Sequence, residues 1–221
     1  MAVCSVGIRH YGTIPYSSTT AKVLVVGIDY FTKWVEVEAL ATITEKNIRG
    51  FVWRCIICRF GIPRVLVSDN GKQFNNNSFR DFGSQLGIRN HYSSPAHPQA
   101  NGQVKVTSRS LLKIIKTWLK GANGIWPEEL PSILLTYRTM ARTPTKETPF
   151  RLTYGNKAVI LAEVGLIRYR VHNHDKSKND NAMRLWLDLV DEVKATVEQS
   201  LARYHDRMVK HYNSRVRHRD F

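Results

Sequence analysis

One carboxylate stands where a β-sheet would present it for chemistry. The apolar run Val65-Leu66-Val67 is typical of a buried strand, and it ends in Ser68-Asp69-Asn70-Gly71. Open α/β folds bind their ligands at the carboxyl ends of such strands, and a carboxylate there is an oxygen donor for hard cations such as Mg²⁺. Lys105 follows at the start of a strong helical pattern, with thirty-five residues between the two.

The cysteines offer a second candidate chemistry. Cys55 and Cys58 form a C-x-x-C pair inside a helical run over residues 45–60. A zinc site would need two more ligands at suitable spacing, and no second pair follows nearby. Three cysteines make a disulfide framework unexpected and suit a reducing compartment. We therefore predict that Cys55 and Cys58 are core thiols.

The charge of the chain indicates its partner. The 221 residues carry a formal net charge of +15, and 43% of them are hydrophobic, enough for a sizeable core. A balance this basic favours a polyanion partner, of which nucleic acid is the commonest, over a merely basic solvated surface. The sequence has no transmembrane run or signal-like start, so we expect one large or two small soluble domains and no membrane partner.

The elements that must position Asp69 follow from apolar periodicity. Three strands joined by short connections, at residues 3–8, 22–29 and 34–38, predict an antiparallel meander. A helix over 45–60 has Thr44 as its N-cap and stops at Gly61 and Pro63. After the strand at Val65, we expect a short helix at 79–86 and a strand at 88–92.

The C-terminal half reads as helices. A helix is expected over 101–120, and one of its faces carries a basic stripe, made of Lys105, Arg109, Lys113, Lys116 and Lys120. Phosphate contact and a solvated face are equally good interpretations of this stripe. Another helix is expected at 128–142, a polar linker at 172–181, and a long amphipathic helix at 185–212. That last helix either packs on its own core or self-associates. We place the domains at 1–155, the core, and 156–221, the linker and long helix.

Longer motifs carry a family resemblance. Val67-Ser-Asp69-Asn-Gly-Lys-Gln-Phe74 and Ser94-Pro-Ala-His-Pro-Gln-Ala-Asn-Gly-Gln103 closely resemble the integrase core of gypsy-class long-terminal-repeat retrotransposons, above all the plant versions. The resemblance implies an α/β fold, a ribonuclease H-like mixed five-stranded sheet flanked by helices, here with a C-terminal helical extension. Relatives add an upstream zinc-binding module and a C-terminal β-barrel, so we expect this chain to be a fragment.

The family cuts and joins DNA with two Asp and one Glu, which hold two Mg²⁺ ions about 4 Å apart. Carried over residue by residue, the second carboxylate is Asp69. The third position is Lys105, in Gly102-Gln-Val-Lys-Val-Thr107. The first falls on Arg9, because Val6-Gly7-Ile8-Arg9 stands where the family reads Trp-Gly-Ile-Asp. Asp29, at the end of the second predicted strand, is the remaining candidate for the first carboxylate, ahead of Glu36 and Glu38.

The replacement of two family carboxylates by Arg9 and Lys105 changes the expected chemistry. Three carboxylates carry −3, whereas Arg9, Asp69 and Lys105 sum to +1, and arginine cannot deprotonate to relieve the repulsion of a cation. At about 4 Å and an effective dielectric of 20, each unit pair is worth roughly 4 kcal/mol. We therefore expect Asp69 to be the sole retained metal-ligand residue, no bound cofactor, and an inactive enzyme, although active relatives use Mg²⁺.

Three hypotheses remain open for function. The first is a catalytically silent integrase core, located in the nucleus or a cytoplasmic particle. The second is a DNA-binding module without catalysis, and the third is a self-associating remnant, joined through the core or the long helix. The residues expected to contact nucleic acid are Lys72, Gln73, Asn101, Gln103, Lys105, Arg109, Lys113 and Lys116.

Overall fold

A computed structural model describes residues 5–11, 23–93, 109–110, 113, 126–155 and 176–214. The chain divides into two compact units, the first ending at Arg138 and the second beginning at Thr139. The predicted division at residue 155 stays a prediction. No helix among the described residues is both long and apolar enough to cross a bilayer.

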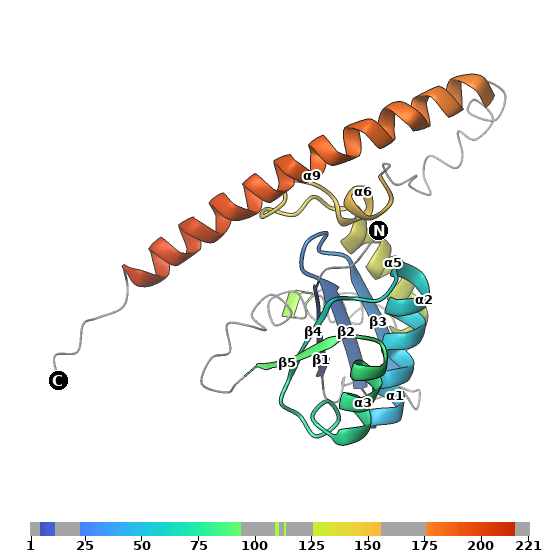
Figure 1. Cartoon of the computed structure of the whole chain (residues 1–221), viewed down its shortest axis with the longest axis vertical. Helices are drawn as coiled ribbons and strands as arrows, with labels where there is room; N and C mark the ends of the chain where they lie inside the picture. The colour runs from blue at the N-terminus through green and yellow to red at the C-terminus, as the bar shows by residue number, and fades with distance from the viewer. Residues whose placement is uncertain are drawn as a thin grey trace. The chain divides into compact units, whose positions relative to one another are not determined.

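The first unit is built on a mixed five-stranded sheet (Figure 1). The spatial order is β3-β2-β1-β4-β5, with β1 antiparallel to β2, β2 antiparallel to β3, and β4 parallel to both β1 and β5. The predicted meander and the mixed sheet are confirmed. The strands are β1 (Ser5–Tyr11), β2 (Val23–Asp29), β3 (Val35–Leu40), β4 (Val65–Asp69) and β5 (Arg89–Ser93).

A continuous helical segment follows the meander. It consists of α1 (Glu45–Phe51), the π-helical η1 (Val52–Ile57) and the short α2 (Cys58–Phe60). The Thr44 side chain accepts a hydrogen bond from the Asn47 amide, which confirms the predicted N-cap, and Gly61 ends the segment with φ of 90°. The prediction for Cys58 was wrong: its side chain is exposed, because it lies on the outer face of the segment, while Cys55 is half-buried.

The other helices are α3 (Asn77–Gln85), α5 (Trp126–Thr139), α6 (Pro149–Tyr154) and α9 (Lys176–Asn213). The predicted linker at 172–181 was wrong over its second half, because α9 already begins at Lys176; residues 172–175 lie outside the described part of the chain. A run of polar residues without Gly or Pro does not stop a helix. The predicted helix over 101–120 also lies outside the described residues, apart from 109, 110 and 113.

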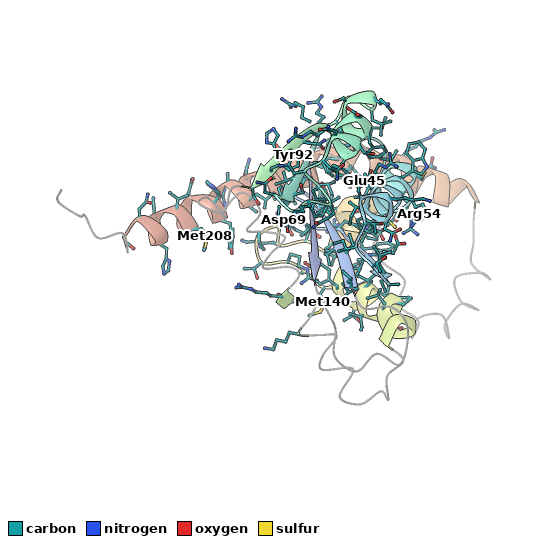
Figure 2. The ribbon with its side chains drawn as sticks, turned by 90° about the horizontal axis from the view of Figure 1, so that it is seen from below. Glu45, Arg54, Asp69, Tyr92, Met140 and Met208 are labelled. Carbon is teal, nitrogen blue, oxygen red and sulfur yellow. The ribbon has the colours of Figure 1, made fainter. Side chains whose placement is uncertain are left out.

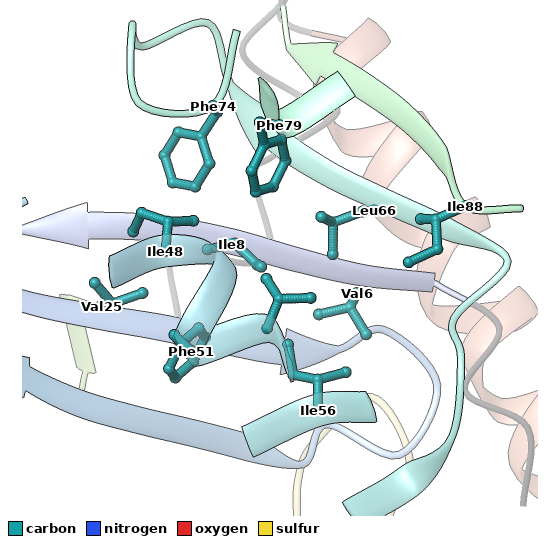
Figure 3. Close-up of a cluster of buried hydrophobic side chains, with 11 residues drawn as sticks. Val6, Ile8, Val25, Ile48, Phe51, Ile56, Leu66, Phe74, Phe79 and Ile88 are labelled. Atoms are coloured by element: carbon teal, nitrogen blue, oxygen red, sulfur yellow. The ribbon is translucent and has the colours of Figure 1, made fainter. Parts of the chain in front are cut away.

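Helices cover both faces of the sheet. On one face, β1, β2 and β4 contribute to a cluster with α1, η1 and α3, which we call the α1-side cluster (Figure 3); its buried members include Val6, Ile8, Phe51, Leu66 and Phe79. On the opposite face, β2 and β3 pack against α5 in the α5-side cluster, which includes Val26, Ile28, Val35, Ile133 and Tyr137. The sheet is therefore a central layer between two hydrophobic clusters, so polar side chains are expected mainly at the ends of its strands.

Candidate functional site

The register of β1 and β4 brings Arg9 beside Asp69. The parallel pairs run from Ser5 opposite Val65 to Ile8 opposite Ser68, so the next step along both strands reaches Arg9 and Asp69. On its other side Asp69 pairs with Ser93, the last residue of β5. The carboxyl ends of β1, β4 and β5 thus meet at one edge of the sheet, as the carboxylate site predicted from sequence requires.

Positions 9 and 69 also belong to one face. Ile8 and Leu66 are both in the α1-side cluster, and successive residues of a strand alternate between faces. Arg9 is paired with Val26, which belongs to the α5-side cluster, so position 9 lies on that face. Position 69 is three residues after Leu66 and falls on the same face. Lys105 and the side chain of Arg9 lie outside the described part of the chain.

The loop after β4 is folded back onto Asp69. The Gly71 amide donates to Asp69 Oδ1 at 3.2 Å, and the Phe74 and Asn75 amides both donate to the Gly71 carbonyl at 2.9 Å. Phe74 is fully buried and meets Phe79 edge to face at a centroid distance of 6.0 Å, which anchors the loop in the core. Asp69, labelled in Figure 2, is half-buried. The backbone hydrogen bonds to Gly71 and the buried Phe74 ring hold the loop that follows it in one conformation.

A polar network next to this loop was not predicted from sequence. Asn75 Nδ2 donates to Asn70 Oδ1 at 2.5 Å, and the Arg80 guanidinium donates to Asn75 Oδ1. Arg80 also lies over the Tyr92 ring, with 5.9 Å from guanidinium carbon to ring centroid. The sequence signal for this network is the run of three asparagines at residues 75–77, where α3 begins, and such a run is equally typical of an ordinary loop.

Asp29 lies at the opposite end of the sheet from Asp69. It is paired with Val6, three residues before Arg9, and at about 3.3 Å per residue that is a separation of about 10 Å along β1. Its Oδ2 accepts from the Thr32 amide at 2.8 Å and the Thr32 hydroxyl at 2.6 Å, and burial raises the pKa of its carboxyl. Asp29 therefore shapes the β2–β3 turn and cannot supply the first metal-ligand carboxylate.

The same turn buries Lys33, which predicts a pH-dependent stability. Lys33 is 7% exposed, has φ of 61°, and donates from Nζ to the Tyr30 carbonyl. Burial lowers the pKa of its ammonium from the ordinary lysine value of 10.5 to about 8. Between these two pH values the unfolded chain binds one proton more than the folded chain, so the free energy of unfolding rises with pH. We expect the unfolding free energy of the wild type, minus that of Lys33→Met, to rise by up to about 3 kcal/mol across this window.

Urea unfolding at pH 7.5, 8.5 and 9.5 measures that difference. Subtraction removes the opposing contribution of Cys55, whose pKa burial raises to about 11, since both proteins contain it. A difference that is flat or falls with pH would show that Lys33 is not desolvated.

Glu36 and Glu38 are occupied elsewhere. Glu36 is buried and paired with Arg138 and Arg59, and Glu38 is paired with Arg54 at 2.7 Å. Both carboxylates are on β3, an outer strand that β2 and β1 separate from β4, so neither lies beside Asp69.

The residues predicted to contact nucleic acid are only partly placed. Lys72 is exposed and Gln73 half-buried in the Asp69 loop, and Arg109 and Lys113 are exposed. Asn101, Gln103, Lys105 and Lys116 lie outside the described residues. Within the part of the chain that is described, no group of three or more His, Cys, Asp and Glu side chains could hold a metal ion.

Comparison with known proteins agrees with this geometry. Residues 6–98 match the family model of the integrase core domain. The chain is 34% identical over 147 residues to the Gag-Pol polyprotein of woolly monkey sarcoma virus and 29% identical over 149 residues to the Pro-Pol polyprotein of simian foamy virus type 1. These matches cover 65% and 67% of this chain, but only 8% and 13% of the two polyproteins.

Solved structures share the fold at low sequence identity. The HTLV-2 integrase catalytic core domain, solved in complex with magnesium in a trimeric form, aligns with a TM-score of 0.56 at 18% identity, over 70% of this chain and 98% of that one. A chain of the simian T-cell lymphotropic virus intasome, in complex with PP2A regulatory subunit B56 gamma, aligns with a TM-score of 0.61 at 19% identity, over 72% of this chain and 57% of that one. The five-stranded mixed sheet flanked by helices is thus the ribonuclease H-like fold of integrase catalytic cores, and residues 6–98 are similar in sequence to the integrase core domain family.

Proposed function

We propose that this chain is the core of a gypsy-class retrotransposon integrase that binds DNA without cutting or joining it. The observation that carries the proposal is the β1–β4 register, which sets Arg9 next to Asp69 at the edge where three strands end. Arg9 is where the family has its first carboxylate, and Lys105 is where it has the third. We place such a chain in the nucleus or in a cytoplasmic particle.

The donor set does not fit a pair of magnesium ions. Mg²⁺ prefers oxygen ligands in near-octahedral geometry, and phosphodiester chemistry of this class uses two ions clamped between carboxylates. Of the three family positions, only Asp69 supplies oxygen, and one of its oxygens already accepts the Gly71 amide. Arginine and lysine at the other two have no acceptor atom and repel a cation. No reaction step through a metal is therefore assigned to this chain.

A strand-transfer assay tests the loss of catalysis. The purified chain is incubated with a labelled duplex that ends in a 3′-hydroxyl and with a target plasmid, in Mg²⁺ and separately in Mn²⁺. We expect no joined product above the level of an Asp69→Asn variant, because that variant lacks the last carboxylate. Joining that depends on Asp69 would overturn the proposal.

DNA binding by the chain is expected to be steeply salt-dependent. Each phosphate neutralised by Lys or Arg contributes about −0.9 to the slope of log affinity against log salt. Arg109 and Lys113 are exposed and one helical turn apart in the predicted basic stripe. Replacing both with alanine should reduce the magnitude of that slope by about two, measured by fluorescence anisotropy on a labelled duplex.

A matched control lies at the other end of the sheet. Arg64 and Arg89 are exposed and flank the starts of β4 and β5, opposite the Asp69 edge. The Arg64→Ala, Arg89→Ala double variant removes the same charge and should leave the salt slope unchanged. Equal slopes for the two double variants would mean that the binding is general electrostatics and not contact at the proposed face.

Self-association is the second candidate, and one feature of α9 favours it. Leu185, Leu189 and Met208 are 63%, 47% and 49% exposed on this 38-residue helix. Exposed apolar side chains at helical spacing are used in helix–helix contacts. Light scattering on the full chain and on a chain truncated near residue 178 tests this, since an unchanged number of subunits per particle would show that α9 does not hold copies of the chain together.

A further inference from the structure

Asn70 and Gly71 form an Asn-Gly dipeptide in the turn directly after β4. Such a dipeptide can modify itself, because the backbone nitrogen that follows an asparagine can attack the side-chain amide carbon. Glycine hinders the attack least, since it has no Cβ and the widest range of backbone conformations. Asn70 is exposed and Gly71 half-buried, so water reaches the turn.

The structure adds two groups that would assist this attack. The Gly71 amide, the nucleophile, donates to Asp69 Oδ1 at 3.2 Å, so a carboxylate is placed to accept its proton. The Asn70 Oδ1 atom, on which negative charge develops, accepts from Asn75 Nδ2 at 2.5 Å. A base on the nucleophile and a donor on the developing oxyanion are the two parts of a minimal acyl-transfer site.

The orientation of both amides is fixed by a third residue. The Arg80 guanidinium can only donate, so the Asn75 atom it meets must be Oδ1, which turns Nδ2 toward Asn70. The Asn70 atom facing that donor must then be its carbonyl oxygen. The backbone amide of Asn75 also donates to the Gly71 carbonyl at 2.9 Å. This bond ties the residue that supplies the Nδ2 donor to the turn that contains the nucleophile.

We propose that Asn70 is a self-deamidation site assisted by Asp69 and Asn75. The Gly71 nitrogen forms a bond to Asn70 Cγ as its proton passes to the Asp69 carboxylate. The bond from Cγ to the amide nitrogen then breaks, and ammonia leaves with that proton, which closes a five-membered succinimide. Water opens the ring to aspartate or isoaspartate. One water is consumed and one ammonia released, with no oxidant or reductant.

The product changes the charge of the candidate site. Deamidation places a new carboxylate at position 70, next to Asp69 and close to strand position 9, which is an arginine in this sequence. Isoaspartate would in addition lengthen the backbone by one carbon within the Asp69 loop. The reaction uses only residues 69–80 and does not depend on whether the chain binds DNA.

Peptide mapping of the aged protein tests the proposal with internal references. The sequence holds two other Asn-Gly pairs, Asn101-Gly102 and Asn123-Gly124, and cleavage after Lys and Arg separates the three into peptides 65–72, 90–105 and 121–138. Folded and urea-unfolded chains are aged side by side at pH 8, and each deamidated peptide is quantified by mass spectrometry. In urea the three pairs should react at similar rates.

In the folded chain we expect Asn70 to react roughly tenfold faster than in urea, below the range of about 10² to 10⁴ that a positioned acid or base contributes in enzymes. Asn75→Asp keeps an acceptor for Arg80 but removes the donor to Asn70, and should return the folded rate to that of the unfolded chain. Asn76→Asp is the matched control, because aspartate also caps α3 and the substitution adds the same charge one residue away. A folded rate at or below the unfolded rate, or equal rates in Asn75→Asp and the wild type, overturns the proposal.

Discussion

Replacing Arg9 with aspartate and Lys105 with glutamate together is expected to tighten Mg²⁺ binding by at least about 100-fold, which corresponds to about 2.7 kcal/mol. The physical reason is the sign of two charges. A unit pair at about 4 Å contributes roughly 4 kcal/mol at an effective dielectric of 20, and a divalent ion doubles that figure. The restored site would present three carboxylates, of which positions 9 and 69 are on adjacent strands and on one face.

Titration calorimetry with Mg²⁺, and with Mn²⁺ as the tighter-binding test ion, measures this change. A chain with Arg207→Glu and Lys210→Glu is the charge control, since both residues are exposed on α9 and the substitutions change the net charge equally. Adding Asp69→Asn to the restored chain should abolish the gain. Tight binding by the unmodified chain, or no gain in a restored chain with a native circular dichroism spectrum, would contradict the electrostatic account.

Sequence periodicity is sufficient to predict the individual strands and the position of Asp69 at the end of one of them. The meander, the buried β4 strand and the Thr44 cap depend on neighbours a few residues apart, and these local preferences agree with the final fold. The mixed topology came from the family resemblance, because apolar runs do not reveal which strands pair. The register is set by side-chain packing across the sheet, and it is the structure that shows Arg9 beside Asp69.

Interactions between distant residues could not be predicted in this way. Glu36 is a weak metal-ligand candidate in the sequence. The residues around it indicate only an alternating strand and do not reveal that its carboxylate has a distant partner. Its partner Arg138 is roughly a hundred residues later in the sequence, on helix α5. Cys58 is predicted to be a core thiol only because no further zinc ligands follow at suitable spacing, whereas η1 buries Val52 and Ile56 and Cys58, the first residue of α2, is exposed.

Glu36 is the residue whose substitution should cost the most stability. Its Oε1 accepts from Trp34 Nε1 at 2.9 Å and from Arg59 at 3.1 Å, and its Oε2 meets Arg138 Nη2 at 3.0 Å. The Arg138 side chain is 16% exposed, lies 4.2 Å over the Trp34 ring, and also donates to the Val35 carbonyl at 2.7 and 3.0 Å. This network fastens α5 to β3 within the first unit.

Glu36→Gln is therefore expected to destabilise the fold by about 3–5 kcal/mol, because it leaves the Arg138 charge buried without its counter-ion. Glu38→Gln is the matched control: it is the same substitution two residues along the same strand, but its partner Arg54 is 59% exposed, so we expect less than about 1 kcal/mol. Urea unfolding followed by tryptophan fluorescence compares the two. Since domains of this kind have about 5–15 kcal/mol in total, Glu36→Gln should unfold at a far lower urea concentration than Glu38→Gln, and coincident curves would mean that the buried carboxylate contributes no more than an exposed one.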